Sequence, residues 1–246
     1  MKRVVDCGIA VVALLLLIPL LTAIAVAVWL EDRGSPWYRG VRVGRGRREF
    51  RMLKFRSMRT GASQTGVNST AAGDARITRV GRFLRAWKLD ELPQLWNVVR
   101  GDMSLVGPRP QVPEDAALYT SEELWMLEVR PGISDLASIV FSDESEILAG
   151  SADPDLLYNQ IIRPWKSRLA LLYVDRGCWP TDLRILVWSA GAVVSRPWAL
   201  ARVEKLLEQW GVGEPLLSMA RRQTPLLAYP PPGARAVVSR YRMKTA

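Results

Sequence analysis

The longest apolar run lies near the N-terminus, where residues 7–30 contain no charged side chain. At about 1.5 Å per residue, a helix of this length could cross the hydrocarbon core of a bilayer. Three interpretations are open: a cleaved signal peptide, a spanning helix, or a re-entrant helix that enters and leaves on one face. The run is longer than a signal-peptide core. Basic residues at both ends and Pro19, which bends a helix, favour the re-entrant form without excluding a kinked span.

Apolar and polar residues then alternate, and this pattern in residues 41–58 predicts a basic β-hairpin with its turn at Gly44-Arg45-Gly46. Residues 60–75 are small and polar, which indicates a loop. Helical spacing begins at Ile77, and a second helix is predicted from about Glu91 to Val99. Further helices are predicted near 121–128, 155–175, 181–195 and 199–210. Trp and Arg beside aliphatic residues in 182–188 suit a helix at the membrane interface, although core aromatics explain them equally well.

Charge is concentrated in one part of the chain. The net charge is +10, and residues 31–109 alone carry 17 basic and 7 acidic side chains. This local excess indicates an anionic partner: nucleic acid, lipid headgroups or a phosphorylated substrate. The chain has no His, which excludes His-dependent catalytic triads and zinc sites built on imidazole. Its two Cys are too few for a disulfide framework.

Asp90 and Glu91 lie at the centre of this basic segment, with Arg82, Arg85 and Lys88 just before them. Asp90 alone would suit a helix N-cap. A carboxylate is also a nucleophile toward phosphorus, and attack on a diphosphate needs cations that screen the phosphate oxygens. The surrounding bases therefore favour phosphoryl-transfer chemistry.

A stiff basic loop follows at Gly107-Pro108-Arg109-Pro110. Pro108 and Pro110 fix φ on both sides of Arg109, which is then presented with little loss of entropy. A structural ion pair is the alternative role for Arg109.

Four motifs follow the N-terminal apolar helix in order: Lys54–Met58, Leu89–Asn97, Gly101–Pro110 and Arg130–Ile133. Together they resemble the bacterial sugar transferases, also called monotopic phosphoglycosyl transferases. The resemblance covers residues 1–140 strongly and the remainder loosely, and the sequence departs from the family pattern after Ile133.

The resemblance implies transfer of a sugar 1-phosphate from a UDP-sugar to polyprenol (undecaprenyl) phosphate, with release of UMP, which begins a lipid-linked glycan. It implies Asp90 as the nucleophile of a covalent phospho-sugar intermediate, Glu91 as the second carboxylate, and Mg²⁺ held by both. The phosphate- and substrate-binding residues that it implies are Lys54, Arg56, Arg85, Pro108, Arg109 and Pro110.

The predicted fold class is α+β, predominantly helical, with a re-entrant membrane helix, a small β-hairpin and interfacial amphipathic helices. The predicted domains are a membrane helix at 1–30, a catalytic domain at 31–215 and a partly disordered Pro-containing tail at 216–246. The expected location is the cytoplasmic face of the bacterial inner membrane, as a monotopic protein. Expected partners are UDP-sugar, polyprenol phosphate and membrane lipids, without nucleic acid, and a homodimer is left open. The alternative is a membrane-tethered basic binding protein without catalysis.

Overall fold

The computed structural model describes residues 2–62 and 73–240, so most of the predicted loop at 60–75 lies outside the described residues. The chain forms two compact units. The described part of the first unit comprises residues 2–62, 73–118 and 127–133, and that of the second comprises 119–126 and 134–240. Helices predominate in both, and the strands form two small two-stranded sheets, which confirms the coarse fold class.

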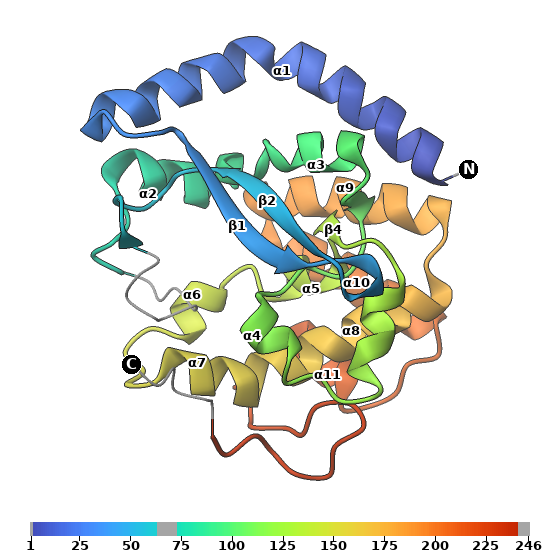
Figure 1. Cartoon of the computed structure of the whole chain (residues 1–246). Helices are drawn as coiled ribbons and strands as arrows, with labels where there is room; N and C mark the ends of the chain where they lie inside the picture. The colour runs from blue at the N-terminus through green and yellow to red at the C-terminus, as the bar shows by residue number, and fades with distance from the viewer. Residues whose placement is uncertain (1, 63–72, 241–246) are drawn as a thin grey trace. The chain divides into compact units, whose positions relative to one another are not determined.

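The first unit begins with α1 (Lys2–Asp32), a helix that contains Pro19 and is bent along its length (Figure 1). Among the described residues it is the one helix long and apolar enough to cross a membrane. Its buried side chains are Asp6 and Ala10 toward one end, and Ile24 and Val28 toward the other. The residues between these pairs are exposed or only half-buried. Helix α1 therefore packs on the first unit near its two ends and leaves its apolar middle uncovered.

Polar contacts fix the N-terminal end of α1. The Arg3 guanidinium donates to the carbonyl oxygens of Val98 and Val99, and the Val99 contact is 2.8 Å long. The Ser104 hydroxyl donates to the buried carboxylate of Asp6. Arg3 thereby donates to two carbonyls in the last turn of a neighbouring helix, and the Val98 carbonyl also accepts from Gly101 N–H at 3.1 Å.

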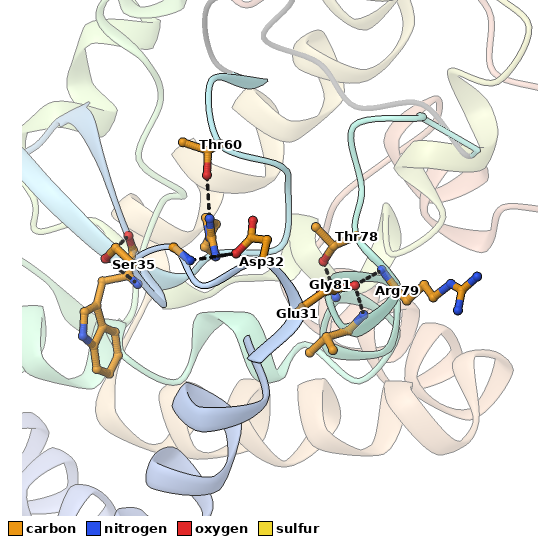
Figure 2. Close-up of polar contacts among 11 residues, drawn as sticks. Glu31, Asp32, Ser35, Thr60, Thr78, Arg79 and Gly81 are labelled. Carbon is orange, nitrogen blue, oxygen red and sulfur yellow. Dashed lines mark hydrogen bonds and ion pairs between the residues drawn. The ribbon is translucent and has the colours of Figure 1, made fainter. Parts of the chain in front are cut away.

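Polar contacts also fix the C-terminal end of α1 (Figure 2). Glu31 Oε1 accepts from the backbone N–H groups of Arg79 and Val80, at 2.7 and 3.3 Å. Asp32 accepts from the guanidinium of Arg56. Both ends of α1 are consequently tied to the same compact unit.

The predicted hairpin is confirmed, but its strands are β1 (Trp37–Val43) and β2 (Glu49–Phe55). They pair antiparallel, from Trp37 opposite Phe55 to Val43 opposite Glu49, and η1 (Arg45–Arg47) lies in the turn. β1 begins before the predicted position because the Trp37 and Phe55 rings stack at 5.0 Å across the open end of the hairpin.

The next segment brings two short helices against β2. They are α2 (Arg79–Ala86), which is N-capped by Thr78, and α3 (Gln94–Arg100), with the 3₁₀ turn η3 (Leu89–Glu91) between them. A Cβ at Gly81 would lie 2.0 Å from the Ser57 carbonyl oxygen, so α2 contacts the chain after β2 backbone to backbone. Lys88, with φ at 54°, turns the chain from α2 into η3. The remaining elements here are α4 (Pro113–Ala116) and the paired strands β3 (Ser104–Val106) and β4 (Gly132–Ser134), which the sequence did not predict.

The second unit is helical. Its long helices are close to prediction, whereas the predicted helix at 121–128 is a 3₁₀ helix and the predicted helix at 155–175 contains a π-turn. Part of the predicted tail makes defined contacts: the Tyr229 and Trp165 rings stack at 4.3 Å, and Gln160 Nε2 donates to the Val238 carbonyl at 2.9 Å. The elements are η4 (Glu123–Glu128), α5 (Leu136–Val140), α6 (Glu144–Ile147), α7 (Pro154–Leu157), η5 (Tyr158–Ile162), α8 (Arg163–Arg176), α9 (Trp179–Val194), α10 (Arg196–Gln209) and α11 (Leu216–Arg221).

Candidate active site

Three segments of the first unit bring two cations onto one carboxylate. Lys54, from β2, donates to Glu91 Oε1 at 2.8 Å. Arg109 contacts both carboxylate oxygens of Glu91: Nη1 lies 3.2 Å from Oε2, and Nη2 donates to Oε1. A bidentate arginine contact of this kind is strong and directional. We call Lys54, Glu91 and Arg109 the Glu91 cluster.

The loop before Arg109 is held as the sequence predicts. Pro108 and Pro110 are buried, whereas Arg109 is half-buried. The Pro108 carbonyl accepts from Gly132 N–H at 3.0 Å. A Cβ at Gly107 would lie 2.5 Å from the Arg130 carbonyl oxygen, so only glycine allows this close approach. The predicted finger is therefore fixed against the Arg130–Ile133 motif, and its Arg109 is also an ion-pair partner.

Asp90 and Glu91 are adjacent, but their acidities differ. Burial raises the pKa of Asp90, and although Lys54, Arg85 and Arg109 act against it, the pKa stays above its ordinary value. Burial would also raise the pKa of Glu91, but there Arg109 and Lys54 outweigh it and hold the pKa far below its ordinary value. Environments that separate the pKa values of two neighbouring carboxylates give them different chemical roles. Glu91 is a fixed anion, and Asp90 is the more basic of the two.

Asp90 as a whole residue is 7% exposed, and its carboxylate forms no hydrogen bond or ion pair with any residue that the structure describes. A buried carboxylate without donors is poorly solvated and keeps its oxygen lone pairs available. Asp90 is therefore the carboxylate of the pair whose oxygens are available, and Glu91 with its two cations lies beside it.

Arg85 and Arg56 differ in their relation to this site. Arg85, in the last turn of α2, lowers the pKa of Asp90 by its positive charge, and its implied phosphate-binding role stays a prediction. Arg56 instead contacts Asp32 and donates to Thr60 Oγ1 at 2.7 Å (Figure 2). The structure thus brings Lys54, Arg85 and Arg109 to Asp90 and Glu91, and it gives Arg56 partners at the end of α1.

Asn97 is a structural residue of the site to which the sequence analysis gave no role. Its Oδ1 accepts from Leu53 N–H at 2.9 Å, and its Nδ2 donates to the Arg51 carbonyl at 2.9 Å. The side chain bonds the edge of β2 as a neighbouring strand would, and it fixes α3 against the strand that carries Lys54. A polar residue within the apolar face of a predicted helix was the available signal.

The described residues contain no group of three or more Cys, Asp or Glu side chains close enough to hold a metal ion by themselves. Mg²⁺ needs only one or two protein carboxylates when substrate phosphates supply further ligands. Asp90, which lacks a hydrogen-bond partner in the described chain, suits this role, whereas both Glu91 oxygens already accept from cations.

Comparison with known proteins places these motifs in one family. The model of the family described as "Bacterial sugar transferase" matches residues 1–196. The UDP-N-acetylgalactosamine-undecaprenyl-phosphate N-acetylgalactosaminephosphotransferase of Aeromonas hydrophila is 44% identical over 142 residues, which are 56% of this chain and 34% of that protein. The undecaprenyl-phosphate glucose phosphotransferase of Komagataeibacter xylinus is 43% identical over 145 residues, 56% of this chain and 27% of that protein.

A third relative is covered to a larger extent. The UDP-glucose:undecaprenyl-phosphate glucose-1-phosphate transferase of Caulobacter vibrioides is 43% identical over 149 residues, 56% of this chain and 53% of that protein. The chain thus spans between 27% and 53% of the lengths of these three relatives.

Proposed function

The chain belongs to the bacterial sugar transferase family, and from this premise we propose that it transfers a sugar 1-phosphate from a UDP-sugar to polyprenol (undecaprenyl) phosphate. The observation that carries the proposal is the poorly solvated Asp90 carboxylate beside the Glu91 cluster. The three named relatives act on undecaprenyl phosphate by name, and two of the names specify a UDP-sugar used by those proteins.

The reaction that these residues support has two displacements at one phosphorus. In the first, an Asp90 oxygen forms a bond to the sugar-bearing phosphorus, and the bond from that phosphorus to the bridging oxygen breaks. UMP leaves with the bridging oxygen and its electron pair. In the second, an oxygen of polyprenol phosphate attacks the same phosphorus, and the acyl-phosphate bond breaks to return the Asp90 carboxylate.

The cations oppose the repulsion between the carboxylate and the diphosphate. Lys54 and Arg109 are held in place by Glu91, so they need little reorganisation when charge develops on the leaving phosphate. Arg85 contributes a third positive charge close to Asp90. Mg²⁺ would be held by Asp90 with diphosphate oxygens, and it would neutralise phosphate charge; Glu91, the second ligand that the resemblance implies, already binds Lys54 and Arg109 through its two oxygens.

The test measures UMP release from UDP-sugars and the mass of the intact protein. Wild-type protein given UDP-sugar without polyprenol phosphate should gain the mass of one phospho-sugar. Asp90→Asn keeps the side-chain shape, and it should lose both the adduct and UMP release. Asp175→Asn, at an exposed position of the second unit, is the matched control and should behave as wild type. An active Asp90→Asn protein would overturn the assignment of the nucleophile, and activity that never depends on a UDP-sugar would favour the binding-protein alternative.

The proposed topology is a re-entrant α1 on the cytoplasmic face of the membrane. Its support is that Arg3, Asp6, Glu31 and Asp32 tie both ends of the helix to one compact unit, while the apolar middle is uncovered. A straight span would place the two ends on opposite faces of the bilayer.

Topology can be tested by cysteine labelling. In a background with Cys7→Ser and Cys178→Ser, single cysteines at Lys2 and Ser35 should resist an impermeant maleimide in intact cells. Both should react once the membrane is permeabilised. Labelling of only one site in intact cells would contradict the re-entrant helix.

A second membrane contact is proposed for α9. Trp179, Leu183 and Val187 are exposed and lie four residues apart, so they share one face of the helix. Such a face suits the membrane interface. Leu183→Asp combined with Val187→Asp should then weaken binding of the protein to lipid vesicles, while Arg184→Asp, at an exposed position on the same helix, separates this effect from that of charge alone. Equal binding by wild type and the double variant would contradict the interfacial role.

A further inference from the structure

Gln94, the first residue of α3, is completely buried. Neither its Oε1 nor its Nε2 has a hydrogen-bond partner among the residues that the structure describes. A buried amide without partners loses its hydration and gains nothing in return, so it destabilises the fold. Native proteins keep few such groups, and each one needs an explanation.

Gln94 lies one helical turn from Asp90. Leu92 and Pro93, between η3 and α3, also have right-handed helical backbone angles, so the backbone is helical from Leu89 to Arg100, with 3₁₀ hydrogen bonds from Leu92 to Leu89 and from Leu95 to Leu92. Gln94 therefore lies in the turn directly after that of Asp90. The Asp90 carboxylate has no donor in the described chain, and this next turn carries an amide whose two N–H groups are unused.

Packing of α3 does not account for Gln94. Asn97, on the same side of the helix, bonds Leu53 N–H and the Arg51 carbonyl, and its amide also donates to Asp102 at 3.2 Å. The side chain that joins α3 to β2 is therefore Asn97, and it is fully engaged. Gln94 adds no hydrogen bond to that contact.

We propose that Gln94 is the positioning residue of Asp90: its Nε2–H donates to one carboxylate oxygen while the diphosphate substrate is bound, and directs the other oxygen to phosphorus. The role rests on the proposed function. The substrate phosphates compete for the positive charges that stabilise Asp90 in the free protein, namely Lys54, Arg85 and Arg109. A neutral amide can then orient the Asp90 carboxylate. A cationic donor in the same place would make that carboxylate a poorer nucleophile.

The experiment replaces the amide with an apolar group of similar length, Gln94→Met. Because this change removes two buried polar atoms without partners, the melting temperature of the protein should rise by roughly 2–4 °C. The kcat for UMP release should fall by about 10- to 100-fold, the effect of a misplaced reacting group, and KM for the UDP-sugar should stay within about threefold. Gln209→Met, at the exposed end of α10, is the matched control and should change neither quantity.

A merely structural amide would give the opposite result. A lower melting temperature for Gln94→Met, or failure to fold, would show that the amide holds the protein together and would overturn the role. An unchanged kcat with a raised melting temperature would also overturn it. Gln94→Asn, which keeps a shorter amide, should recover part of the lost kcat without the gain in melting temperature. Absence of UMP release from the wild type would overturn the proposed function and this role with it, whereas an active wild type and an equally active Gln94→Met would overturn the role alone.

Discussion

Lys54 and Arg56 lie two residues apart, and each forms an ion pair with a carboxylate, yet the two pairs connect different parts of the first unit. Lys54 contacts Glu91, whose neighbour Asp90 has no side-chain partner among the described residues. Arg56 contacts Asp32, whose neighbour Glu31 accepts from the start of α2 (Figure 2). The first pair lies beside the carboxylate that we propose as the nucleophile, and the second joins the apolar helix to the rest of the unit. The residue types alone do not separate these roles; the groups beside each carboxylate do.

Of the variants that test the difference between the two ion pairs, Lys54→Met should lose the most activity. The substitution leaves Glu91 with Arg109 alone and removes a preorganised charge near the reacting phosphate, so kcat/KM should fall by about 10²- to 10³-fold. Steady-state UMP release measures the effect. Lys166→Met, which breaks the Lys166–Glu144 pair in the second unit, is the control and should leave kcat/KM nearly unchanged. Equal losses in both variants would remove the distinction between the Glu91 cluster and an ordinary ion pair.

A smaller loss is expected for Arg109→Lys. The charge remains, but lysine cannot contact both Glu91 oxygens in one plane, so kcat/KM should fall by about 10- to 100-fold. Arg221→Lys tests the same substitution at an arginine that contacts Glu204 and Glu214 in the second unit. Full activity of Arg109→Lys would mean that positive charge alone is sufficient at this position.

Arg56→Met should alter stability more than catalysis. Loss of the Asp32 and Thr60 contacts should lower the free energy of unfolding by about 1–2 kcal/mol, which is roughly 2–8 °C in melting temperature. The kcat/KM for UMP release should stay within about threefold of the wild-type value. Thermal unfolding in detergent and UMP release, measured on one preparation, decide the point. A loss of activity as large as that of Lys54→Met would instead support the phosphate-binding role that the motif resemblance implies for Arg56.

The smallest effect is expected for Glu31→Gln. The amide oxygen can still accept from Arg79 and Val80, but the negative charge at the N-terminus of α2 is lost, at about 0.3–1 kcal/mol. The loss should shrink at high salt, because salt screens the charge. Glu49→Gln, at an exposed position of β2, controls for a change of net charge. A salt-independent loss would indicate that geometry, not charge, matters at this end of α1.

Local patterns predicted the elements that carry the site. Alternation predicted the hairpin with Lys54, and the flanking prolines predicted a stiff Arg109. The partners of these side chains were not predictable, because they depend on where β2 ends and on which later or earlier segments pack beside it. β2 stops at Phe55, so Lys54 lies within the strand while Arg56 follows it. The β3–β4 pair and the strand-like contact of Asn97 join residues distant in sequence, and local periodicity carries no information about them.

The anchored N-terminal end of α1 also sets an order of events during synthesis. Arg3 bonds the carbonyl of a residue 95 positions later, and Asp6 bonds one 98 positions later. At about 5–20 residues per second, the ribosome needs roughly 5–20 s to make the intervening chain. The apolar helix therefore leaves the ribosome well before its anchoring partners exist. In the proposed re-entrant arrangement, the helix can therefore enter the bilayer first, and the rest of the first unit then folds onto a helix that lipid already holds.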